Sequence, residues 1–329
     1  MNAHAMYYEI KQDKKVRCLL CPNSCVITPG NTGLCGIRKN QDGTLYSTIY
    51  GEVSSMAMDP IEKKPLYHFF PGTHILSIGT VGCSLKCRFC QNYGISQNPD
   101  HPTDYYRPQD IVEFAVARGS VGIAYTYNEP FIWYEFVRDT CILAQKRGLK
   151  NVFVTNGYVN QLPLKGILPY ADAFNVDLKS MDDQFYRKII SGKLQPVLDT
   201  ITEISGHPDI ILEVTTLVIP GYNDSGEEME KFTGFLSSLS PDIPYHLSAY
   251  FPMYQFEAPP TSVRTLQTLK HVAEMKMRYV YLGNVGGAGN TLCHNCGAVL
   301  VERMGYSIKK VNCSQGKCKN CGSSVPIIG

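Results

Sequence analysis

Three cysteines lie close together in the stretch Gly82-Cys83-Ser84-Leu85-Lys86-Cys87-Arg88-Phe89-Cys90, with the spacing Cys-x3-Cys-x2-Cys. Structural zinc sites usually combine Cys-x2-Cys pairs into a closed set of four ligands. Three thiolates with one longer gap can instead bind three irons of a [4Fe–4S] cluster and leave the fourth iron without a protein ligand. Such an open iron can chelate a small molecule. The spacing therefore predicts chemistry at a cluster, and the alternative is a zinc site or disulfides.

Between about residues 74 and 285, short apolar runs alternate with helical segments, which is the pattern of βα units around a parallel sheet. Six or seven such units are too few for a closed eight-stranded barrel. Strands are expected at 75–80, 121–126, 151–155, 173–178, 210–218, 245–250 and 279–283. Helices are expected at 108–118, 130–147, 182–190, 225–239 and 261–276. The sequence thus predicts an α/β domain at 74–285, with cysteine-rich regions at 1–73 and 286–329 on either side.

The C-terminal region contains two Cys-x2-Cys-Gly motifs, formed by Cys293 with Cys296 and by Cys318 with Cys321. Each motif places two sulfurs on one tight turn, so four thiolates can close a tetrahedron around one metal ion. In such a short module, metal binding supplies most of the folding free energy. The pattern predicts a zinc-ribbon or rubredoxin-like module that holds either a structural zinc or an iron that passes electrons.

The N-terminal region contains four cysteines, Cys18, Cys21, Cys25 and Cys35, in a loop rich in proline and glycine. Because such a loop has little apolar material to pack, a metal is expected to organise it. An auxiliary iron–sulfur cluster and a zinc site both fit this spacing. Cys141 lies among apolar residues of an expected helix and is interpreted as a core residue.

Bulk composition argues against several classes of protein. The net charge of +2 does not call for nucleic acid or an anionic membrane, and no apolar run approaches the roughly 18 residues of a membrane span. The N-terminus lacks the features of a secretory signal. With 13 cysteines and no export signal, the chain is expected in the reducing cytoplasm, where cysteine clusters bind metals.

An aromatic residue, Phe89, stands directly before the third cysteine of the central loop, and Gln91-Asn92 follow it. With these companions the loop resembles the signature of the radical S-adenosylmethionine (SAM) superfamily. The resemblance covers nearly the whole chain and points to the branch of the pyruvate formate-lyase activating enzymes, and most closely to the AmmeMemoRadiSam-system radical SAM enzymes. It implies a partial (βα)6 TIM-type barrel, a [4Fe–4S] cluster on Cys83, Cys87 and Cys90, and bound SAM near Phe89.

The same resemblance implies the reaction and its partners. A reduced cluster of this type binds SAM through its amino and carboxylate groups, and electron transfer then breaks the C5′–S bond to give a 5′-deoxyadenosyl radical. An electron donor such as a flavodoxin or ferredoxin is implied. An AMMECR-like or Memo-like protein is implied as a partner or substrate.

Other expected SAM contacts follow the second and fourth strands. Thr126-Tyr127-Asn128-Glu129-Pro130 resembles the Gly-Gly-Glu-Pro element of the family, so Asn128 and Glu129 are expected near the ammonium group of SAM. Glu129 also suits a role at the start of the helix that Pro130 opens. The motif Asp177-Leu178-Lys179 matches the activating enzymes residue for residue, so Asp177 is expected on ribose hydroxyls and Lys179 on the SAM carboxylate; a structural salt bridge is the alternative. His246 is interpreted as either a core or a substrate-pocket residue.

The sequence predicts a radical SAM enzyme that abstracts hydrogen from an unidentified substrate, which in the activating-enzyme branch is a protein. One rival is the modification of a small molecule, peptide or base in a pocket closed by residues 50–74. Another is a non-catalytic metal- or nucleic-acid-binding protein that uses the basic residues of the C-terminal module. Arg303, Lys309, Lys310, Lys317 and Lys319 are the basic residues concerned, and they are interpreted as a solvated face.

Overall fold

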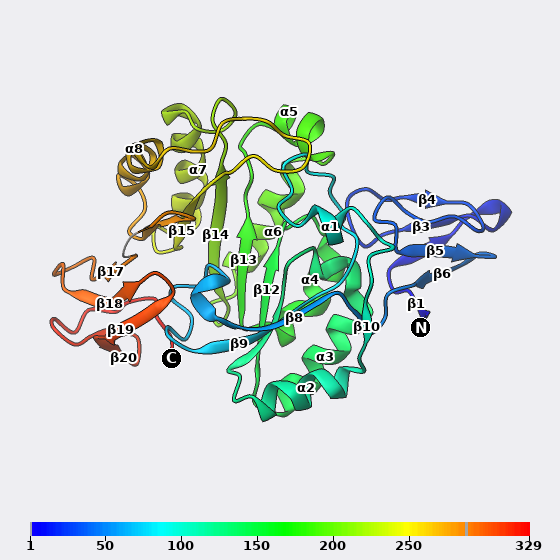
Figure 1. Cartoon of the computed structure of the whole chain (residues 1–329), viewed down its shortest axis with the longest axis horizontal. Coiled ribbons are helices and arrows are strands. Elements are labelled where there is room, and N and C mark those ends of the chain that lie inside the picture. The colour runs from blue at the N-terminus through cyan, green and yellow to red at the C-terminus, as the bar shows by residue number, and fades with distance from the viewer. Residues whose placement is uncertain (1, 287–288) are drawn as a thin grey trace.

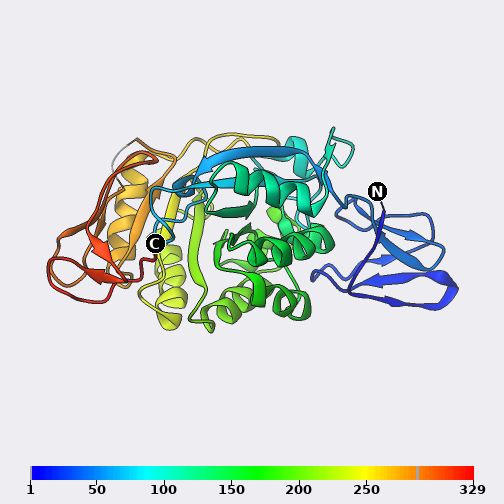
Figure 2. The ribbon, with the colours of Figure 1, turned by 90° about the horizontal axis from the view of Figure 1, so that it is seen from below.

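The computed structural model describes residues 2–286 and 289–329 and places a sheet with its helices between two small β modules (Figure 1). The N-terminal module lies at one end of the molecule and the C-terminal module at the other, and a second view shows the same order (Figure 2). Residue 1 and residues 287–288, which fall in the first and third predicted regions, lie outside the described residues.

An eight-stranded sheet with the order β16-β15-β14-β13-β12-β11-β9-β8 forms the centre of the molecule. All neighbouring pairs from β9 to β16 are parallel, and β8 pairs antiparallel with β9. The strands are β8 (Ser55–Pro60), β9 (His74–Gly79), β11 (Gly122–Tyr125), β12 (Lys150–Thr155), β13 (Ala173–Asp177), β14 (Ile211–Val218), β15 (Tyr245–Ala249) and β16 (Val280–Gly283). The predicted parallel sheet is therefore confirmed, and its edge strand β8 comes from the segment that the sequence assigned to the N-terminal region.

Helices connect the parallel strands and pack against the sheet. They are α1 (Tyr93–Ser96), α2 (Pro108–Ala117), η3 (Pro130–Trp133), α3 (Tyr134–Lys146), α4 (Gln161–Ile167), η4 (Leu168–Tyr170), α5 (Asp183–Phe185), α6 (Gln195–Ser205), α7 (Gly226–Leu239) and α8 (Val263–Glu274). The helix expected at 182–190 begins as α5 and continues as the wider π turn η5 (Tyr186–Ile190). Ser191 ends this turn with a φ of 60°, and the last η5 carbonyls accept hydrogen bonds from the loop at 86–88.

The N-terminal module consists of two three-stranded sheets, β1-β6-β5 and β2-β3-β4. Its strands are β1 (Ala3–His4), β2 (Tyr8–Ile10), β3 (Val16–Cys18), β4 (Val26–Ile27), β5 (Arg38–Gln41) and β6 (Thr44–Ser47); η1 (Gln12–Lys14) joins β2 to β3. A separate two-stranded sheet follows in the chain, in which β7 (Glu52–Val53) pairs antiparallel with β10 (Asp104–Tyr105). Val16, Ile27 and Leu45 are buried in the main core, so this region has more apolar packing than its proline- and glycine-rich loop indicates.

The C-terminal module contains the sheet β17-β18-β19 and the hairpin β20-β21. Its strands are β17 (Thr291–Leu292), β18 (Val299–Met304), β19 (Ser307–Val311), β20 (Cys313–Ser314) and β21 (Lys317–Cys318). Arg303 joins the module to the rest of the chain, because its guanidinium donates to Thr291 Oγ1 at 2.7 Å and to Tyr67 O at 2.6 Å. Arg303 is only 1% exposed, so its assignment to a solvated basic face is wrong. The lysines of that set are exposed.

Beneath this junction lies a buried polar network on η2 (Ile61–Lys63), the segment after it, and β14 to β16. Glu213 accepts a hydrogen bond from His68 N at 2.7 Å and pairs with His246 Nε2 at 2.6 Å. His68 Nε2 lies 2.7 Å from Tyr281 Oη. His246 therefore occupies the core position that the sequence allowed. None of the helices in the described ranges is both long and apolar enough to cross a membrane.

The buried network predicts a loss of stability in mild acid. Burial lowers the pKa of His68 from 6.5 to about 4, so between these pH values the unfolded chain takes up a proton that the folded chain does not. Burial raises the pKa of Glu213, but the hydrogen bond with His246 outweighs burial and lowers this pKa overall. The ionised Glu213 carboxylate therefore stabilises the fold, and this stabilisation is also lost as pH falls. At ~1.4 kcal/mol per pKa unit, His68 alone should lower the free energy of unfolding by about 3 kcal/mol from pH 7 to 4, and a variant that lacks it isolates this contribution from those of other titrating groups.

Denaturant unfolding at a series of pH values measures this loss. In the His68→Gln variant, which keeps polar ends but does not titrate, the decrease between pH 6.5 and 5 should be smaller. Equal decreases in both proteins would show that His68 is not responsible.

Candidate functional site

A cavity of about 460 Å³ opens at the carboxyl ends of the parallel strands, where connecting loops gather side chains from distant parts of the sequence. Most of the residues that the sequence singled out for the central site line it. They are Cys83, Cys87, Phe89 and Cys90 after β9, Asn128 after β11, and Asp177 and Lys179 at the end of β13. The structure therefore brings these residues into one site.

Contacts with neighbouring elements hold the loop that carries the three cysteines. Lys86 N donates to Ile190 O at 2.8 Å, so the loop satisfies a carbonyl at the end of η5. Gly82 has a φ of 84°, and a Cβ at this position would lie 2.6 Å from Cys35 O. Only glycine fits this close approach. The loop is thus fixed between η5 and the N-terminal module.

The three thiols are placed to act as ligands. Cys83 and Cys87 are buried, and Cys90 is partly exposed. Leu85 N and Asn156 Nδ2 both lie 3.5 Å from Cys83 Sγ and donate to it. Burial raises the pKa of the Cys87 thiol to about 12 and that of Cys83 higher still, so a metal must displace the protons when it binds. Three thiols that line one cavity fit three irons of a [4Fe–4S] cluster.

Phe89 anchors the end of the loop. Its ring stacks on Phe185 with the centroids 6.0 Å apart and meets Phe256 edge-on at 5.9 Å. The residue is 3% exposed, so its main contribution is packing that keeps Cys87 and Cys90 in place.

The segment after β11 adopts a conformation that normally requires glycine. Tyr127 has a φ of 70°, which is strained for a residue with a side chain. Its hydroxyl donates to Asp59 Oδ2 at 2.8 Å, and its carbonyl accepts from Asn92 Nδ2 at 2.6 Å. Asn128 Nδ2 donates to Gly82 O at 2.8 Å. These hydrogen bonds hold Tyr127 in the left-handed backbone conformation that glycine adopts easily, at a position where the family motif has glycine. They also connect the segment after β11 to the cysteine loop.

Glu129 lies behind the cavity wall and is 1% exposed. Its carboxylate accepts hydrogen bonds from Phe131 N at 3.0 Å, Thr155 Oγ1 at 2.8 Å and Asn156 N at 2.9 Å. Burial raises the pKa of Glu129 to about 7 despite these bonds. The structure therefore shows the helix-start role that the sequence also allowed, while the expected contact with the SAM ammonium stays a prediction.

Asp177 and Lys179 form an ion pair, with 2.8 Å between Oδ2 and Nζ. Burial alone would lower the pKa of Lys179, but the Asp177 carboxylate and the Cys87 sulfur outweigh this effect and raise it. The Lys179 side chain is 14% exposed and that of Asp177 is 36% exposed. A cation and a carboxylate thus face the cavity beside the cysteine loop, where they can bind a zwitterionic ligand.

Comparisons with known proteins agree with this arrangement. The family model for the radical SAM superfamily matches residues 77–233, which include the cysteine loop and Asp177 with Lys179. The chain carries a radical SAM domain. It is 42% identical to an uncharacterized protein of Methanocaldococcus jannaschii, over 98% of this chain and 99% of that protein, and belongs to the same family.

More distant relatives and a solved structure extend the comparison. The chain is 23% identical to the pyruvate formate-lyase 1-activating enzyme of Escherichia coli, over 50% of this chain and 71% of that protein. It is 27% identical to the isethionate sulfite-lyase activating enzyme of Oleidesulfovibrio alaskensis, over 47% of this chain and 50% of that protein. Streptococcus suis SuiB bound to precursor peptide SuiA superposes on 69% of this chain and 51% of its own length, at 12% identity and a TM-score of 0.52, which shows a similar fold.

Several residues that line the radical SAM cavity were not singled out individually by the sequence, although one rival hypothesis placed the segment 50–74 over the pocket. Lys63 and Lys64 follow β8, and Tyr306 reaches the cavity from the turn between β18 and β19. Lys64 is buried, donates to Asp59 Oδ2 at 2.6 Å, and lies 4.5 Å from the centre of the Tyr127 ring. The adjacent lysines at 63–64 offered a weak signal, but no local pattern connects Tyr306 with a cavity on another domain.

The four C-terminal cysteines form a compact cluster that could hold a metal ion. The sulfurs of Cys293, Cys296, Cys318 and Cys321 all lie within 4.8 Å of one another. Cys293 Sγ lies 3.7 Å from Cys321 Sγ, and Cys296 Sγ lies 3.8 Å from Cys318 Sγ. A tetrahedron with metal–sulfur bonds of about 2.3 Å requires sulfurs about 3.8 Å apart. The predicted clustering of the four cysteines is thus present, and its geometry suits zinc and iron equally; metal binding itself stays a prediction.

Hydrogen bonds to the sulfurs of this cluster favour the deprotonated thiolates, which are the form that binds metals. Bonds with Ser323, and then with Asn295, lower the pKa of the Cys321 thiol to about 5, and a bond from Asn320 lowers the pKa of Cys296.

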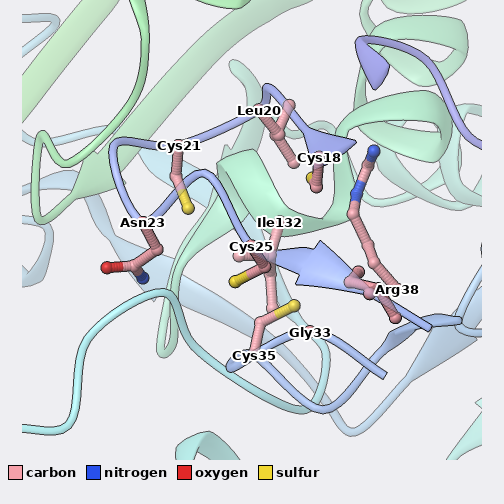
Figure 3. Close-up of a pocket in the computed structure, with 10 residues that line it drawn as sticks. Cys18, Leu20, Cys21, Asn23, Cys25, Gly33, Cys35, Arg38 and Ile132 are labelled. Atoms are coloured by element: carbon pink, nitrogen blue, oxygen red, sulfur yellow. The ribbon is translucent and has the colours of Figure 1, made fainter. Parts of the chain in front are cut away.

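The four N-terminal cysteines surround a separate cavity (Figure 3). Cys18, Cys21, Cys25 and Cys35 line it together, so the predicted grouping is present. Cys141 is a buried core residue of α3, as predicted.

Proposed function

We propose that this chain is a radical SAM enzyme of the cytoplasm, in which Cys83, Cys87 and Cys90 bind a [4Fe–4S] cluster whose fourth iron binds SAM. The single observation that supports this proposal best is that the three thiols and the Asp177–Lys179 pair line the same cavity. When bound and reduced, the cluster supplies the electron that cleaves the C5′–S bond of SAM to give a radical that abstracts hydrogen. Radical SAM enzymes generally need a reductant, for which a flavodoxin or ferredoxin is proposed.

The proposed roles of the protein groups follow from their charge and position. Lys179 pairs with the SAM carboxylate, and Asp177 accepts hydrogen bonds from ribose hydroxyls. Asn128 lines the cavity and holds the cysteine loop, because its Nδ2 donates to Gly82 O and its Oδ1 accepts from Thr80 N at 3.2 Å. We take β9 and β11 to β15 as the six strands of the predicted partial barrel, within an enzyme domain at 74–285 flanked by metal modules at 1–73 and 286–329.

The proposed substrate is a protein, by analogy with the activating enzymes that the chain resembles. An AMMECR-like or Memo-like partner, and membership of the AmmeMemoRadiSam branch, remain proposals that rest on the resemblance of the sequence. One observation favours a second candidate, the modification of a small molecule or peptide. Lys63, Lys64 and Pro65 from the segment 50–74 line the cavity, as expected if this segment helps to enclose a small substrate.

Anaerobic SAM cleavage tests the proposed chemistry. The full chain, reconstituted with iron and sulfide and reduced with dithionite, should convert SAM to 5′-deoxyadenosine and methionine, which chromatography with mass detection quantifies. Samples without dithionite should form neither product. If the intact, reducible cluster forms no 5′-deoxyadenosine above that background, the proposed function is wrong.

A further inference from the structure

The N-terminal cysteines form a second enclosed group of sulfurs outside the radical SAM cavity. Cys18 ends β3, Cys21 and Cys25 lie on the turn between β3 and β4, and Cys35 lies in the loop before β5. Figure 3 shows the four side chains around one space, and Leu20, Ile27 and Ile132 complete its wall. All four cysteines are free of disulfides. Ile132 belongs to η3, so the wall includes a residue of the enzyme domain.

Backbone and side-chain hydrogen bonds hold this ligand loop in place. Leu34 N donates to Cys25 Sγ at 3.5 Å. Asn40 is fully buried, and its Nδ2 donates to Ile27 O and Lys14 O, both at 2.8 Å. Gly33 N donates to Arg38 O at 2.9 Å and closes the turn that carries Cys35. The ligand positions are therefore preorganised by the fold.

A buried cation accompanies the sulfurs. Arg38 lines the cavity, is 1% exposed, and forms an ion pair with Glu135. Its Nη1 donates to Met6 O at 2.8 Å, whereas Nε has no hydrogen-bond partner among the described residues. An unpartnered buried N–H is unfavourable, and negatively charged sulfur ligands nearby would offset this cost. The cavity is thus suited to an anionic thiolate–metal group.

The packing of the sulfurs differs between the two outer modules. In the C-terminal module the four sulfurs are spaced as the ligands of a single ion would be, with 3.7 Å between the sulfurs of Cys293 and Cys321 and 3.8 Å between those of Cys296 and Cys318. In the N-terminal module, across the part of the chain that the structure describes, no three sulfurs all lie within 4.8 Å of one another. Ligands of different irons at the corners of a cube lie further apart than ligands of one ion.

We propose that Cys18, Cys21, Cys25 and Cys35 bind an auxiliary [4Fe–4S] cluster in which every iron has a cysteine ligand. The four thiols give up their protons as iron binds, and the cluster then cross-links β3, the turn after it and the loop before β5.

This site contacts the radical SAM loop directly. Asn23, between Cys21 and Cys25, donates from Nδ2 to Ser84 O at 2.7 Å, and Cys35 O faces Gly82. The auxiliary cluster would therefore support the loop that carries Cys83, so its loss is expected to disturb both centres.

Metal and sulfide analysis of full-length variants tests the proposal without any activity assay. In a Cys83→Ala/Cys87→Ala/Cys90→Ala variant, reconstituted anaerobically, about four irons and four sulfides per chain should remain, with the spectrum of a [4Fe–4S] cluster after reduction. Inorganic sulfide is the decisive readout, because a single ion at the C-terminal site contributes none. Adding Cys21→Ser should remove this sulfide, whereas adding Cys141→Ser should leave it.

Zinc in place of sulfide in the triple variant, or sulfide that survives both Cys21→Ser and Cys25→Ser, would overturn the proposal. Because the triple variant keeps all four N-terminal cysteines, its sulfide content decides the matter even if Cys21→Ser does not fold. The result does not depend on SAM cleavage, so this proposal and the proposed function can fail separately.

Discussion

Replacing Cys87 with alanine is expected to abolish SAM cleavage. Cys87 is buried beside Lys179 in the radical SAM cavity, and its loss leaves two of the three proposed cluster ligands. Removal of an outer partner of a metal ligand already costs about 10- to 100-fold in affinity or activity, so loss of a ligand should cost more. The 5′-deoxyadenosine formed by reduced Cys87→Ala protein should therefore fall to the level of a sample without reductant.

A matched variant separates this effect from damage to the fold. Cys141→Ala also removes a buried thiol, but Cys141 lies in α3 and packs in the core. It should cost about 1 kcal/mol of stability and leave SAM cleavage close to wild type. Full activity in Cys87→Ala, or equal loss in the two variants, would contradict the role assigned to Cys87.

Replacing Cys318 with serine is expected to release the metal of the C-terminal module and to unfold residues 289–329. The apolar cluster of this module is small and includes two of the four proposed ligands, Cys293 and Cys318, so the metal should supply most of its stability. Structural zinc contributes about 10–16 kcal/mol of apparent binding free energy in modules of this kind. Bound metal should fall by one ion per chain, and limited proteolysis should cleave the module first.

The consequences should reach the radical SAM domain. Arg303 of the module donates to Tyr67 O, and Tyr306 lines the cavity, so an unfolded module would withdraw Tyr306 from the site. Cys313→Ser is the matched control, because Cys313 belongs to the module but not to the four-sulfur group. It should retain the ion. An unchanged metal content in Cys318→Ser would show that these four cysteines do not bind metal together.

Much of the fold followed from local sequence patterns. Every strand expected between residues 74 and 285 is present. Buried parallel strands require continuous apolar runs, and the polar turns between them mark where each run ends. The end of the helix at 182–190 was harder to predict. Its last turn widens to a π conformation where its carbonyls meet the cysteine loop, about 100 residues away in the sequence.

The site was only partly predictable for the same reason. Asp177 and Lys179 could be placed on one face because side chains alternate along a strand. Glu129 matched a family motif, yet its carboxylate accepts hydrogen bonds from Thr155 and Asn156 and is not itself among the residues that line the cavity. That orientation depends on the packing of β11 against β12, which no residue near Glu129 reveals.

The sequence by itself determined the chemistry available to this protein, because ligand spacing within a loop is a local property. The triplet Cys83, Cys87 and Cys90 and the two outer cysteine groups were all recognisable in this way. Only the tertiary structure decided that Lys64 and Tyr306 share a cavity with the triplet, and that the C-terminal sulfurs are packed more closely than the N-terminal ones. Such distances depend on contacts between residues far apart in the chain, which the fold establishes as it buries its core.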